Sequence, residues 1–564
     1  MANNTKNIWF NFLQLLNEYK KEILQIYALG LIISFFSLIF PISIQLLINF
    51  IQGAAYSVSL VLIMFMLAIS IVFSAIVQIY QLRIIEFIEQ KIFADFSFRF
   101  IQKFPALHYL EMIYQNSRDL ANRFFDVVTL QKIVQKILID FSFSSIIIIL
   151  SMLLLSFYHP IFIILVLILF VVIYFGVKWT FNKGLESGIQ YSKYKYDTAY
   201  WIEETGSASA TLKLAGITDL HFQKLDNIIK NYYYYRNKHY FTLEKQFILL
   251  NIVKFITIMF FVIVGSILVI EQQMNIGEFV ASEIVISILV NSFDKMVFLI
   301  RTIYDMIVSL AKIHEVLDLK EETLPQLLQE KIKDIPYMKI ELKNASFRYP
   351  DSDKNILDDI NLQINEFESV LLVGESYSGK TTLQKIFATL LFPTKGDIFI
   401  NDKDIYLYDM DTLRFNIGTY LDSDIIFKGT ILENIHLGRN YDYDFLINIS
   451  SKIGLDKTIN NLPDKYETEM LTYGHNYSKS FIAKILFLRA IVTKPKLIIF
   501  ENIFNDIYEK DVPVLLDIIC NTKEYGWTAV VSASDTKYKN YFNKILLLKE
   551  GKLKYYDDIG NYPY

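Results

Sequence analysis

The first half of the chain contains long apolar runs without a single charged residue. No Asp, Glu, Lys or Arg occurs between Ile23 and Leu82 or between Phe141 and Val177. Each run is broken once by a turn-forming Gly or Pro, so each predicts two membrane-crossing helices joined by a tight turn. A third pair of apolar segments, interrupted by a few charges, follows. We therefore expect six spans, near residues 23–50, 57–82, 141–157, 160–177, 251–270 and 279–298.

The distribution of basic residues predicts the orientation of these spans. The short turns at 51–56, 158–160 and 271–278 contain no Lys or Arg, whereas the two long connections, 83–140 and 178–250, contain many. Because Lys and Arg are retained on the cytosolic side during insertion, we expect the turns outside and both termini inside. Both connections have apolar residues at helical spacing and few Gly or Pro, so the helices are expected to continue beyond the bilayer.

Four ionisable residues fall within the third pair of spans. Lys254, Asp294 and Lys295 lie close to the expected cytosolic ends of their spans. Long side chains reach the membrane interface from such positions, so we expect these residues to be interfacial. Glu283 lies deeper, and two interpretations stay open for it: it faces a substrate cavity, or it does not.

The pattern of apolar positions changes after the last expected span. A polar linker is expected at 321–336, and from Met338 onward apolar and polar residues alternate as in a half-exposed strand. Residues 1–320 are therefore predicted to form a membrane domain, and residues 337–564 a soluble domain of short strands and helices.

The strongest motif of the soluble half follows a buried-strand pattern. Residues 369–373 read Ser-Val-Leu-Leu-Val, and residues 374–381 read Gly-Glu-Ser-Tyr-Ser-Gly-Lys-Thr ahead of a helical stretch. This is the G-x-x-x-x-G-K-[ST] spacing of a phosphate-binding loop in its strand–loop–helix context. Backbone N–H groups of such a loop surround the phosphates, Lys380 reaches the terminal ones, and the Thr381 hydroxyl ligates Mg²⁺. The predicted nucleotide-binding residues of this loop are Gly374, Ser376, Ser378, Gly379, Lys380, Thr381 and Thr382.

Composition narrows the functional classes. The chain has 564 residues, of which 53% are hydrophobic, and this is too large and too apolar for one soluble domain. The formal net charge of -4 gives no basic excess, so nucleic acid is not expected as a partner. Cys520 is the only cysteine, which excludes an internal disulfide and a cysteine-rich metal site. The apolar stretch near the N-terminus is too long for a signal peptide, so no cleaved targeting segment is expected.

Further motifs in the soluble half resemble those of the ABC exporter family. Phe347-Arg-Tyr349-Pro350 is similar to the segment whose aromatic residue stacks on adenine, and this implies that role for Tyr349. Segments 393–396, 429–435 and 462–468 resemble later family segments in the right order. Their order and spacing together make the resemblance specific.

The membrane half resembles the same family. Phe40–Gln45 and Ile276–Val280 are similar to segments of exporters of peptides, bacteriocins and type I secretion proteins. By this resemblance, short helices near 116–125 and 203–216 carry the contact with the soluble domain. The resemblance covers nearly the whole chain. It implies an α-helical six-span membrane domain of ABC exporter type followed by an α/β P-loop nucleotide-binding domain.

The signature motif of this family is replaced. In the family, L-S-G-G-Q faces the P-loop of the other domain in a dimer, and the matching stretch here is Tyr477-Ser-Lys-Ser-Phe481. Ser478 alone is retained. The glycines normally let backbone N–H groups approach the γ-phosphate, and the side chains of Lys479 and Ser480 should crowd that approach.

The strand that ends in Asp-Glu in the family ends here in Glu501-Asn502. In one register Glu501 replaces the metal-side Asp, where it would hold Mg²⁺ with Thr381, and Asn502 replaces the catalytic Glu. A neutral amide cannot take a proton from the attacking water, and a lost general base costs about 10²- to 10⁴-fold in rate. In the other register Glu501 is the catalytic residue and Phe500 stands on the metal side. Either register lacks one of the two carboxylates.

Other positions with a role in the family also differ. Ser534 stands where the resemblance places the switch histidine, and Asp422 where it places the glutamine that senses Mg²⁺ and the attacking water. Tyr473 and Tyr508 replace an Arg and the Asp of the dimer-contact loop, and Tyr377 replaces a P-loop Gly. We therefore expect no intact catalytic set, and little or no hydrolysis by the chain alone.

Three hypotheses follow for function. In the first, the chain is the ATP-binding, non-catalytic partner of a second half-transporter in a heterodimeric exporter of peptide or protein cargo. In the second, it is a membrane scaffold or regulator that uses the exporter fold without pumping. In the third, it is a slow homodimeric pump. The expected location is among the lipids of the plasma (inner) membrane of a bacterium, with ATP and Mg²⁺ as cofactors.

Overall fold

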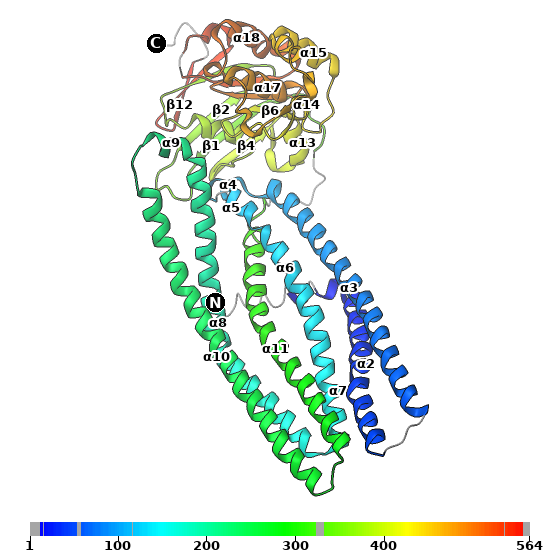
Figure 1. Ribbon diagram of the computed structural model, residues 1–564. Coiled ribbons are helices and arrows are strands. Elements are labelled where there is room, and N and C mark those ends of the chain that lie inside the picture. The colour runs from blue at the N-terminus through cyan, green and yellow to red at the C-terminus, as the bar shows by residue number, and fades with distance from the viewer. Residues whose placement is uncertain are drawn as a thin grey trace. The chain divides into compact units, whose positions relative to one another are not determined.

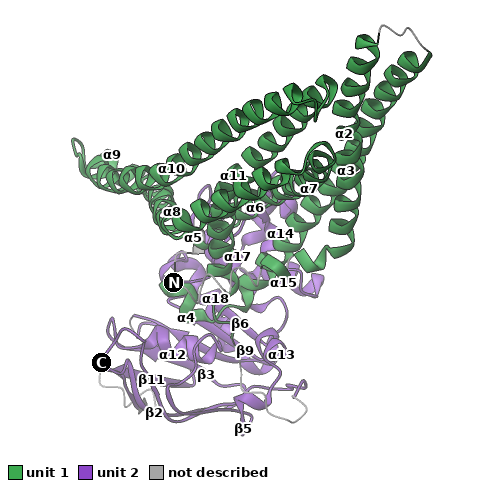
Figure 2. Cartoon of the chain, turned by 90° about the horizontal axis from the view of Figure 1, so that it is seen from below, with its two compact units in different colours: residues 1–322 green, residues 323–564 purple. Residues whose placement is uncertain are grey.

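The computed structural model of the chain contains two compact units, residues 1–322 and 323–564, which Figure 2 shows in different colours. Most of the linker predicted at 321–336 lies outside the described residues. The residues that the structure describes are 12–14, 16–53, 58–115, 117–322, 332–534 and 536–556.

The first unit is built from helices, several of which are very long (Figure 1). α8 has 47 residues and α10 has 51, so each is roughly 70 Å long and exceeds the ~30 Å of hydrocarbon in a bilayer. The helices continue beyond the expected spans, as the sequence predicted. Their bounds are α2 (Lys20–Gln52), α3 (Val58–Ala106), α4 (Tyr109–Tyr114), α5 (Ser117–Asn122), α6 (Phe125–Lys136), a π-helix (Ile137–Phe141), α7 (Ser142–Tyr158), α8 (Ile161–Ser207), α9 (Ser209–Leu214), α10 (Leu220–Ile270) and α11 (Ile276–Leu317).

Five helical segments in the described residues are long and apolar enough to cross a membrane. They are α2, α3, the segment Asp119–Tyr158 that ends in α7, α8 and α10, and they contain the first five predicted spans. The sixth predicted span lies within α11, which is not among these five, so a crossing by α11 stays a prediction. The chain is thus a multi-pass membrane protein with at least five candidate spans.

Local sequence explains where these helices begin. Pro160 precedes α8, and its fixed φ suits the start of a helix. α11 begins with a capping box. The backbone N–H of Glu278 donates to Asn275 Oδ1 at 2.8 Å, and the backbone N–H of Asn275 donates to Glu278 Oε2 at 2.8 Å. The second and third predicted turns therefore lie between helices, whereas residues 54–57 of the first turn lie outside the described residues.

The membrane helices pack in pairs and leave much apolar surface uncovered. α2 lies along α3, and α8 lies along α10 (Figure 1). A buried cluster that includes Leu155, Phe162, Phe261 and Val285 joins α7, α8, α10 and α11. In the most apolar windows of the candidate spans, however, only 11% to 28% of the residues are buried. Such exposed apolar helix faces require lipid or another membrane helix as their neighbour.

The described residues of the second unit form three sheets. A four-stranded sheet has the order β2-β1-β4-β5, a six-stranded sheet the order β12-β11-β3-β10-β9-β6, and β7 pairs with β8. The strands are β1 (Ile340–Phe347), β2 (Leu357–Ile364), β3 (Ser369–Val373), β4 (Lys395–Ile400), β5 (Lys403–Asp404), β6 (Ile417–Tyr420), β7 (Gly429–Thr430), β8 (Glu469–Met470), β9 (Leu497–Glu501), β10 (Thr528–Ser532), β11 (Lys544–Lys549) and β12 (Lys552–Tyr556).

Helices cover the six-stranded sheet and complete the core of this unit. β3, β9 and β10 are buried at every residue, as expected of strands covered on both faces. α17 and α18 contribute many residues to the same core, which also contains Trp527. The helices are α12 (Lys380–Phe387), α13 (Met410–Phe415), α14 (Ile431–His436), α15 (Tyr443–Lys452), α16 (Leu455–Asn460), α17 (Lys479–Ile491), α18 (Val512–Cys520) and α19 (Thr522–Tyr525).

The topology of the six-stranded sheet positions the candidate site. β3, β10, β9 and β6 are neighbours and run parallel. The P-loop follows β3, Ser534 follows β10, Glu501 ends β9 and Asp422 follows β6. Because the carboxyl ends of parallel strands meet at one edge of a sheet, these distant sequence positions converge there.

Candidate functional site

The P-loop runs from β3 to α12 with two glycines at close approaches. Gly379 has φ of 104°, in the left-handed region that favours glycine. A Cβ on Gly379 would lie 2.9 Å from Leu357 Cδ2, and one on Gly374 would lie 2.3 Å from the Leu548 carbonyl oxygen. Both positions therefore require glycine, and the loop has the compact form that a phosphate-binding loop needs.

Polar groups of the loop fit a bound phosphate. Ser378 is buried, and in the described part of the chain its hydroxyl has no hydrogen-bond partner. Ser376 is exposed at the tip of the loop. α12 begins directly after Gly379, so its free backbone N–H groups lie at the loop. An unpartnered buried hydroxyl beside a helix N-terminus suits an anionic ligand.

Lys380 is folded against the loop that precedes it. Its Nζ donates to the Gly374 carbonyl at 2.6 Å and to the Glu375 carbonyl at 2.9 Å. Burial lowers the pKa of this ammonium group, and the nearby Glu501 carboxylate opposes that shift. The contacts hold the cation within the loop, where a phosphate would neutralise it.

Thr381 and Glu501 meet at the edge of the sheet. The Thr381 hydroxyl donates to Glu501 Oε1, and the Asp422 backbone N–H donates to Glu501 Oε2 at 3.1 Å. Glu501 is buried, and β9 ends at this residue. The contact with Thr381 is the one that the first of the two registers requires, and the choice between the registers stays a prediction. A carboxylate and a hydroxyl are oxygen ligands of the kind that Mg²⁺ prefers.

Asn502 follows Glu501, and in the first of the two registers it stands where the family has its general base. Its φ is 49°, and its backbone N–H donates to the Ser532 carbonyl at 3.1 Å. Asn502 and Ser534 both line a polar cavity of about 220 Å³, together with Glu509 and Lys537. The carboxylate in that cavity, Glu509, is paired with Lys537. The structure thus brings Asn502 and Ser534 together, and both are neutral.

Asp422 and Tyr349 contact different parts of the site, Glu501 and the P-loop helix respectively. The Asp422 side chain is exposed, and only its backbone contacts Glu501. The Tyr349 hydroxyl lies 3.4 Å from Thr382 Oγ1, and its ring meets the Phe347 ring edge-on at 4.9 Å between centroids. Tyr349 is therefore close to the P-loop helix, and its role in adenine stacking stays a prediction.

The signature-equivalent residues begin α17. Ser478 is the N-cap, and its hydroxyl accepts from the Phe481 backbone N–H at 3.2 Å. Ser480 is buried and accepts from the Tyr508 backbone N–H at 3.5 Å. The Lys479 side chain is exposed. The serine hydroxyls are thus used within the domain, and Lys479 presents the free polar group of the segment.

Two contacts in these regions were not anticipated from the sequence. Gln384 on α12 donates from Nε2 to the Phe500 carbonyl at 2.9 Å and so ties the P-loop helix to β9. In the first unit, Lys254 and Asp294 form an ion pair at 2.8 Å between α10 and α11. The sequence predicts only that each of these two residues lies at the membrane interface, and it does not predict that they pair. No local sequence pattern predicts such contacts, because the two residues of each contact are far apart in sequence.

The remaining sequence predictions for the helical unit concern Glu283 and the two coupling segments. Glu283 is exposed on α11, and neither of its two interpretations is tested. The predicted coupling segments 116–125 and 203–216 contain the short helices α5 and α9. Asn116 itself lies outside the described residues.

Comparison with known proteins agrees with these features. Residues 357–505 match the family described as ABC transporter. The alpha-hemolysin translocation ATP-binding protein HlyB of Escherichia coli is 26% identical over 299 residues, which cover 51% of this chain and 40% of HlyB. The leukotoxin translocation ATP-binding protein LktB of Mannheimia haemolytica is 26% identical over 295 residues, with the same coverage. The chain thus matches about 40% of the length of these relatives.

A solved structure extends the likeness to the membrane unit. The structure of a bacterial Atm1-family ABC exporter with ATP bound matches this chain with a TM-score of 0.81 and 15% identity. The match covers 95% of this chain and 94% of the other. At this identity the likeness concerns the fold alone. Residues 357–505 thus match the ABC transporter family, and the chain as a whole has the fold of an ABC exporter, with a helical membrane region followed by an α/β domain.

Proposed function

We propose that this chain is the ATP-binding, non-catalytic partner in a heterodimeric exporter of peptide or protein cargo. One observation carries the proposal: the Glu501 carboxylate contacts the P-loop Thr381, and the next residue is Asn502. The position that follows the metal-side carboxylate therefore holds a neutral amide, which cannot accept a proton from water. A second half-transporter supplies the missing carboxylate in a site of its own.

Nucleotide binding is supported by the loop itself. Gly374 and Gly379 keep the loop compact, and the buried Ser378 hydroxyl is available to a phosphate oxygen. Lys380 would neutralise the terminal phosphates, while Thr381 and Glu501 would hold Mg²⁺. The metal would shield phosphate charge, and these residues would orient the nucleotide without cleaving it.

A membrane scaffold or regulator is the second candidate function, and the segment at the start of α17 favours it. In a catalytic dimer this segment completes the site of the facing domain. Here the Ser478 hydroxyl caps its own helix, and Lys479 and Ser480 replace two glycines. If Lys479 does not contact the facing nucleotide, the chain completes no active site and acts without driving transport.

The proposals for cargo and location are based on the relatives. HlyB and LktB are named for translocation of alpha-hemolysin and leukotoxin, so we propose peptide or protein cargo here. The proposed location is the inner membrane of a bacterium, with both termini in the cytosol. The orientation is supported by Lys and Arg in the long connections and their absence from the short turns.

ATP turnover of the purified chain tests this function. We expect the full chain in nanodiscs to hydrolyse ATP far more slowly than about 1 s⁻¹, the low end for ordinary enzymes. Addition of a second half-transporter with an intact Glu and signature is expected to restore turnover, and a Glu→Gln change in that second protein to abolish it again.

Asn502→Asp in this chain is the control variant. It is expected to leave turnover of the mixed complex within twofold, because the proposal assigns no proton transfer to this position. Turnover near 1 s⁻¹ by the chain alone would contradict the non-catalytic role. No stimulation of turnover by a half-transporter with an intact Glu and signature would favour the scaffold.

A further inference from the structure

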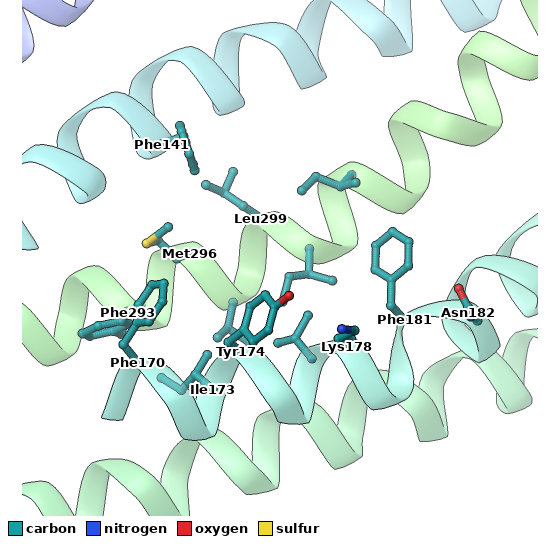
Figure 3. Close-up of a pocket in the computed structure, with 14 residues that line it drawn as sticks. Phe141, Phe170, Ile173, Tyr174, Lys178, Phe181, Asn182, Phe293, Met296 and Leu299 are labelled. Atoms are coloured by element: carbon teal, nitrogen blue, oxygen red, sulfur yellow. The ribbon is translucent and has the colours of Figure 1, made fainter. Parts of the chain in front are cut away.

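The helical unit contains a large apolar cavity between α8 and α11. Its volume is about 520 Å³, within the range of small-molecule sites, and the π-helix residue Phe141 forms part of its wall. Figure 3 shows Phe170 and Tyr174 of α8 facing Phe293 and Met296 of α11 across it. The lining is almost entirely aliphatic and aromatic, so the cavity suits a hydrocarbon occupant.

The cavity has one polar end. Lys178 and Asn182 lie four residues apart on α8, hence on one face of the helix, and both line the cavity (Figure 3). The Lys178 ammonium group lies 5.7 Å from the centre of the Tyr174 ring. Within the described part of the chain, Lys178 has no carboxylate partner at ion-pair distance. This cation is therefore available to an anionic ligand.

The polar end lies at the level of the membrane interface. Lys178 is the first charged residue after the uncharged run from Phe141 to Val177. The next residue, Trp179, is 76% exposed, and tryptophan is enriched where helices leave the hydrocarbon. A ligand headgroup bound at Lys178 would therefore lie among lipid headgroups, and its body would extend toward the bilayer interior.

The length of the cavity fits one leaflet. Along α8, the distance from Asn182 to Phe170 is roughly 18 Å at 1.5 Å per residue, close to half of the ~30 Å hydrocarbon thickness. A second apolar cavity, of about 350 Å³, shares Phe170 and Phe293 with the first and continues beyond them. An acyl chain that enters at Lys178 thus meets apolar walls along its whole length.

We propose that this cavity binds one anionic diacyl phospholipid, with its phosphate at Lys178 and Asn182 and an acyl chain along Phe170 and Phe293. On the orientation proposed above, the lipid belongs to the inner leaflet. A peptide fits less well, because its backbone N–H and C=O groups would lack partners against these apolar walls. The lipid site does not depend on whether the chain hydrolyses ATP.

Lipid binding to the full chain tests this proposal. The purified chain in detergent is titrated with phosphatidylglycerol or with phosphatidylcholine of the same acyl chains, and bound lipid is counted by native mass spectrometry. We expect one phosphatidylglycerol per chain with roughly fivefold tighter binding than phosphatidylcholine. This preference corresponds to about 1 kcal/mol, the contribution of one lysine near an anionic lipid.

A matched pair of variants locates the site. Lys178→Gln is expected to weaken phosphatidylglycerol binding about fivefold and to leave phosphatidylcholine binding unchanged. Lys183→Gln is the control, because Lys183 is an exposed lysine of the same helix that does not line the cavity, and it should bind lipid as the parent does. Equal effects of the two variants would overturn the assignment.

A cavity-filling variant distinguishes lipid binding in the cavity from attraction of the lipid to surface charge. Ile173→Trp places a larger side chain in the cavity and is expected to weaken both lipids at least fivefold, with the helical content unchanged by circular dichroism. The proposal would be overturned if the parent bound the two lipids equally well. It would also be overturned if the parent bound no lipid because a second copy of the chain covers the cavity.

Discussion

Tyr377 occupies an unfavourable backbone conformation in the P-loop. Its φ is 64°, and its side chain is fully exposed, at 103% of the reference area. A left-handed conformation costs a non-glycine residue about 1–2 kcal/mol, and no packing contact of the exposed ring offsets this cost. The loop therefore keeps its shape despite this residue, because Gly374 and Gly379 and the Lys380 contacts determine it.

Tyr377→Gly is expected to stabilise the soluble unit by about 1 kcal/mol, since glycine adopts this φ without steric cost. For a unit of this size the melting temperature should rise by roughly 2–4 °C. Thermal unfolding of the full chain is followed by calorimetry, in which the soluble unit gives a cooperative transition of its own.

Tyr443→Gly is the control for the glycine substitution. Tyr443 is 59% exposed and is the first residue of α15, where glycine is expected to lower stability by at most about 0.5 kcal/mol relative to tyrosine. The two variants should therefore shift the melting temperature in opposite directions. A lower melting temperature for Tyr377→Gly would mean that the tyrosine ring makes a stabilising contact.

At the scale of elements, one buried arginine joins three segments of the soluble unit. Arg489 of α17 donates from Nε to the Asn434 carbonyl at 2.7 Å and from Nη1 to the Ile425 carbonyl at 2.9 Å. Its Nη2 also donates to Asn434 Oδ1 at 3.0 Å. Burial lowers the pKa of this guanidinium group to about 10, so it stays charged at neutral pH. α14 and the loop before it are thus held to α17.

Arg489→Leu is expected to destabilise the soluble unit by roughly 3 kcal/mol or more, because several buried carbonyl acceptors lose their donor. The melting temperature of the full chain should fall by roughly 6 °C or more, at about 2–4 °C per kcal/mol. Lys479→Leu on the same helix is the comparison, since that side chain is exposed and its loss should shift the melting temperature by less than about 2 °C.

The sequence predicted the elements better than the contacts between them. Uncharged runs and the Gly-x-x-x-x-Gly-Lys-Thr spacing are local signals, so the helices and the P-loop appear where we expected them. The π-helix at Ile137–Phe141 and the short pair β7 and β8 have no such signal. The Lys254–Asp294 pair and the cavity at Lys178 require helices that are distant in sequence to meet, and no periodicity within one helix reports this.

At the scale of the whole molecule, the two units differ in how much of their apolar surface is buried. The soluble unit has a continuous core, and its P-loop, Thr381 and Glu501 lie together at one sheet edge. The helical unit leaves long apolar faces uncovered, as in α3, where 11% of the most apolar window is buried. Such faces require lipid or another membrane helix as their neighbour, and the proposed second half-transporter could supply some of these helices.

Nucleotide binding at the P-loop is part of the proposed function, and it is measurable in the intact chain. ATP with Mg²⁺ at about 100 times its Kd should stabilise the soluble unit by about 2.7 kcal/mol, because only the folded P-loop binds it. The melting temperature should then rise by roughly 5–10 °C. Lys380→Ala should remove most of this rise, since it deletes the cation held in the loop. Lys457→Ala, at an exposed lysine of α16, should keep it. A Lys380→Ala variant that ATP stabilises as strongly as the parent would contradict the assignment of this loop as the phosphate-binding site.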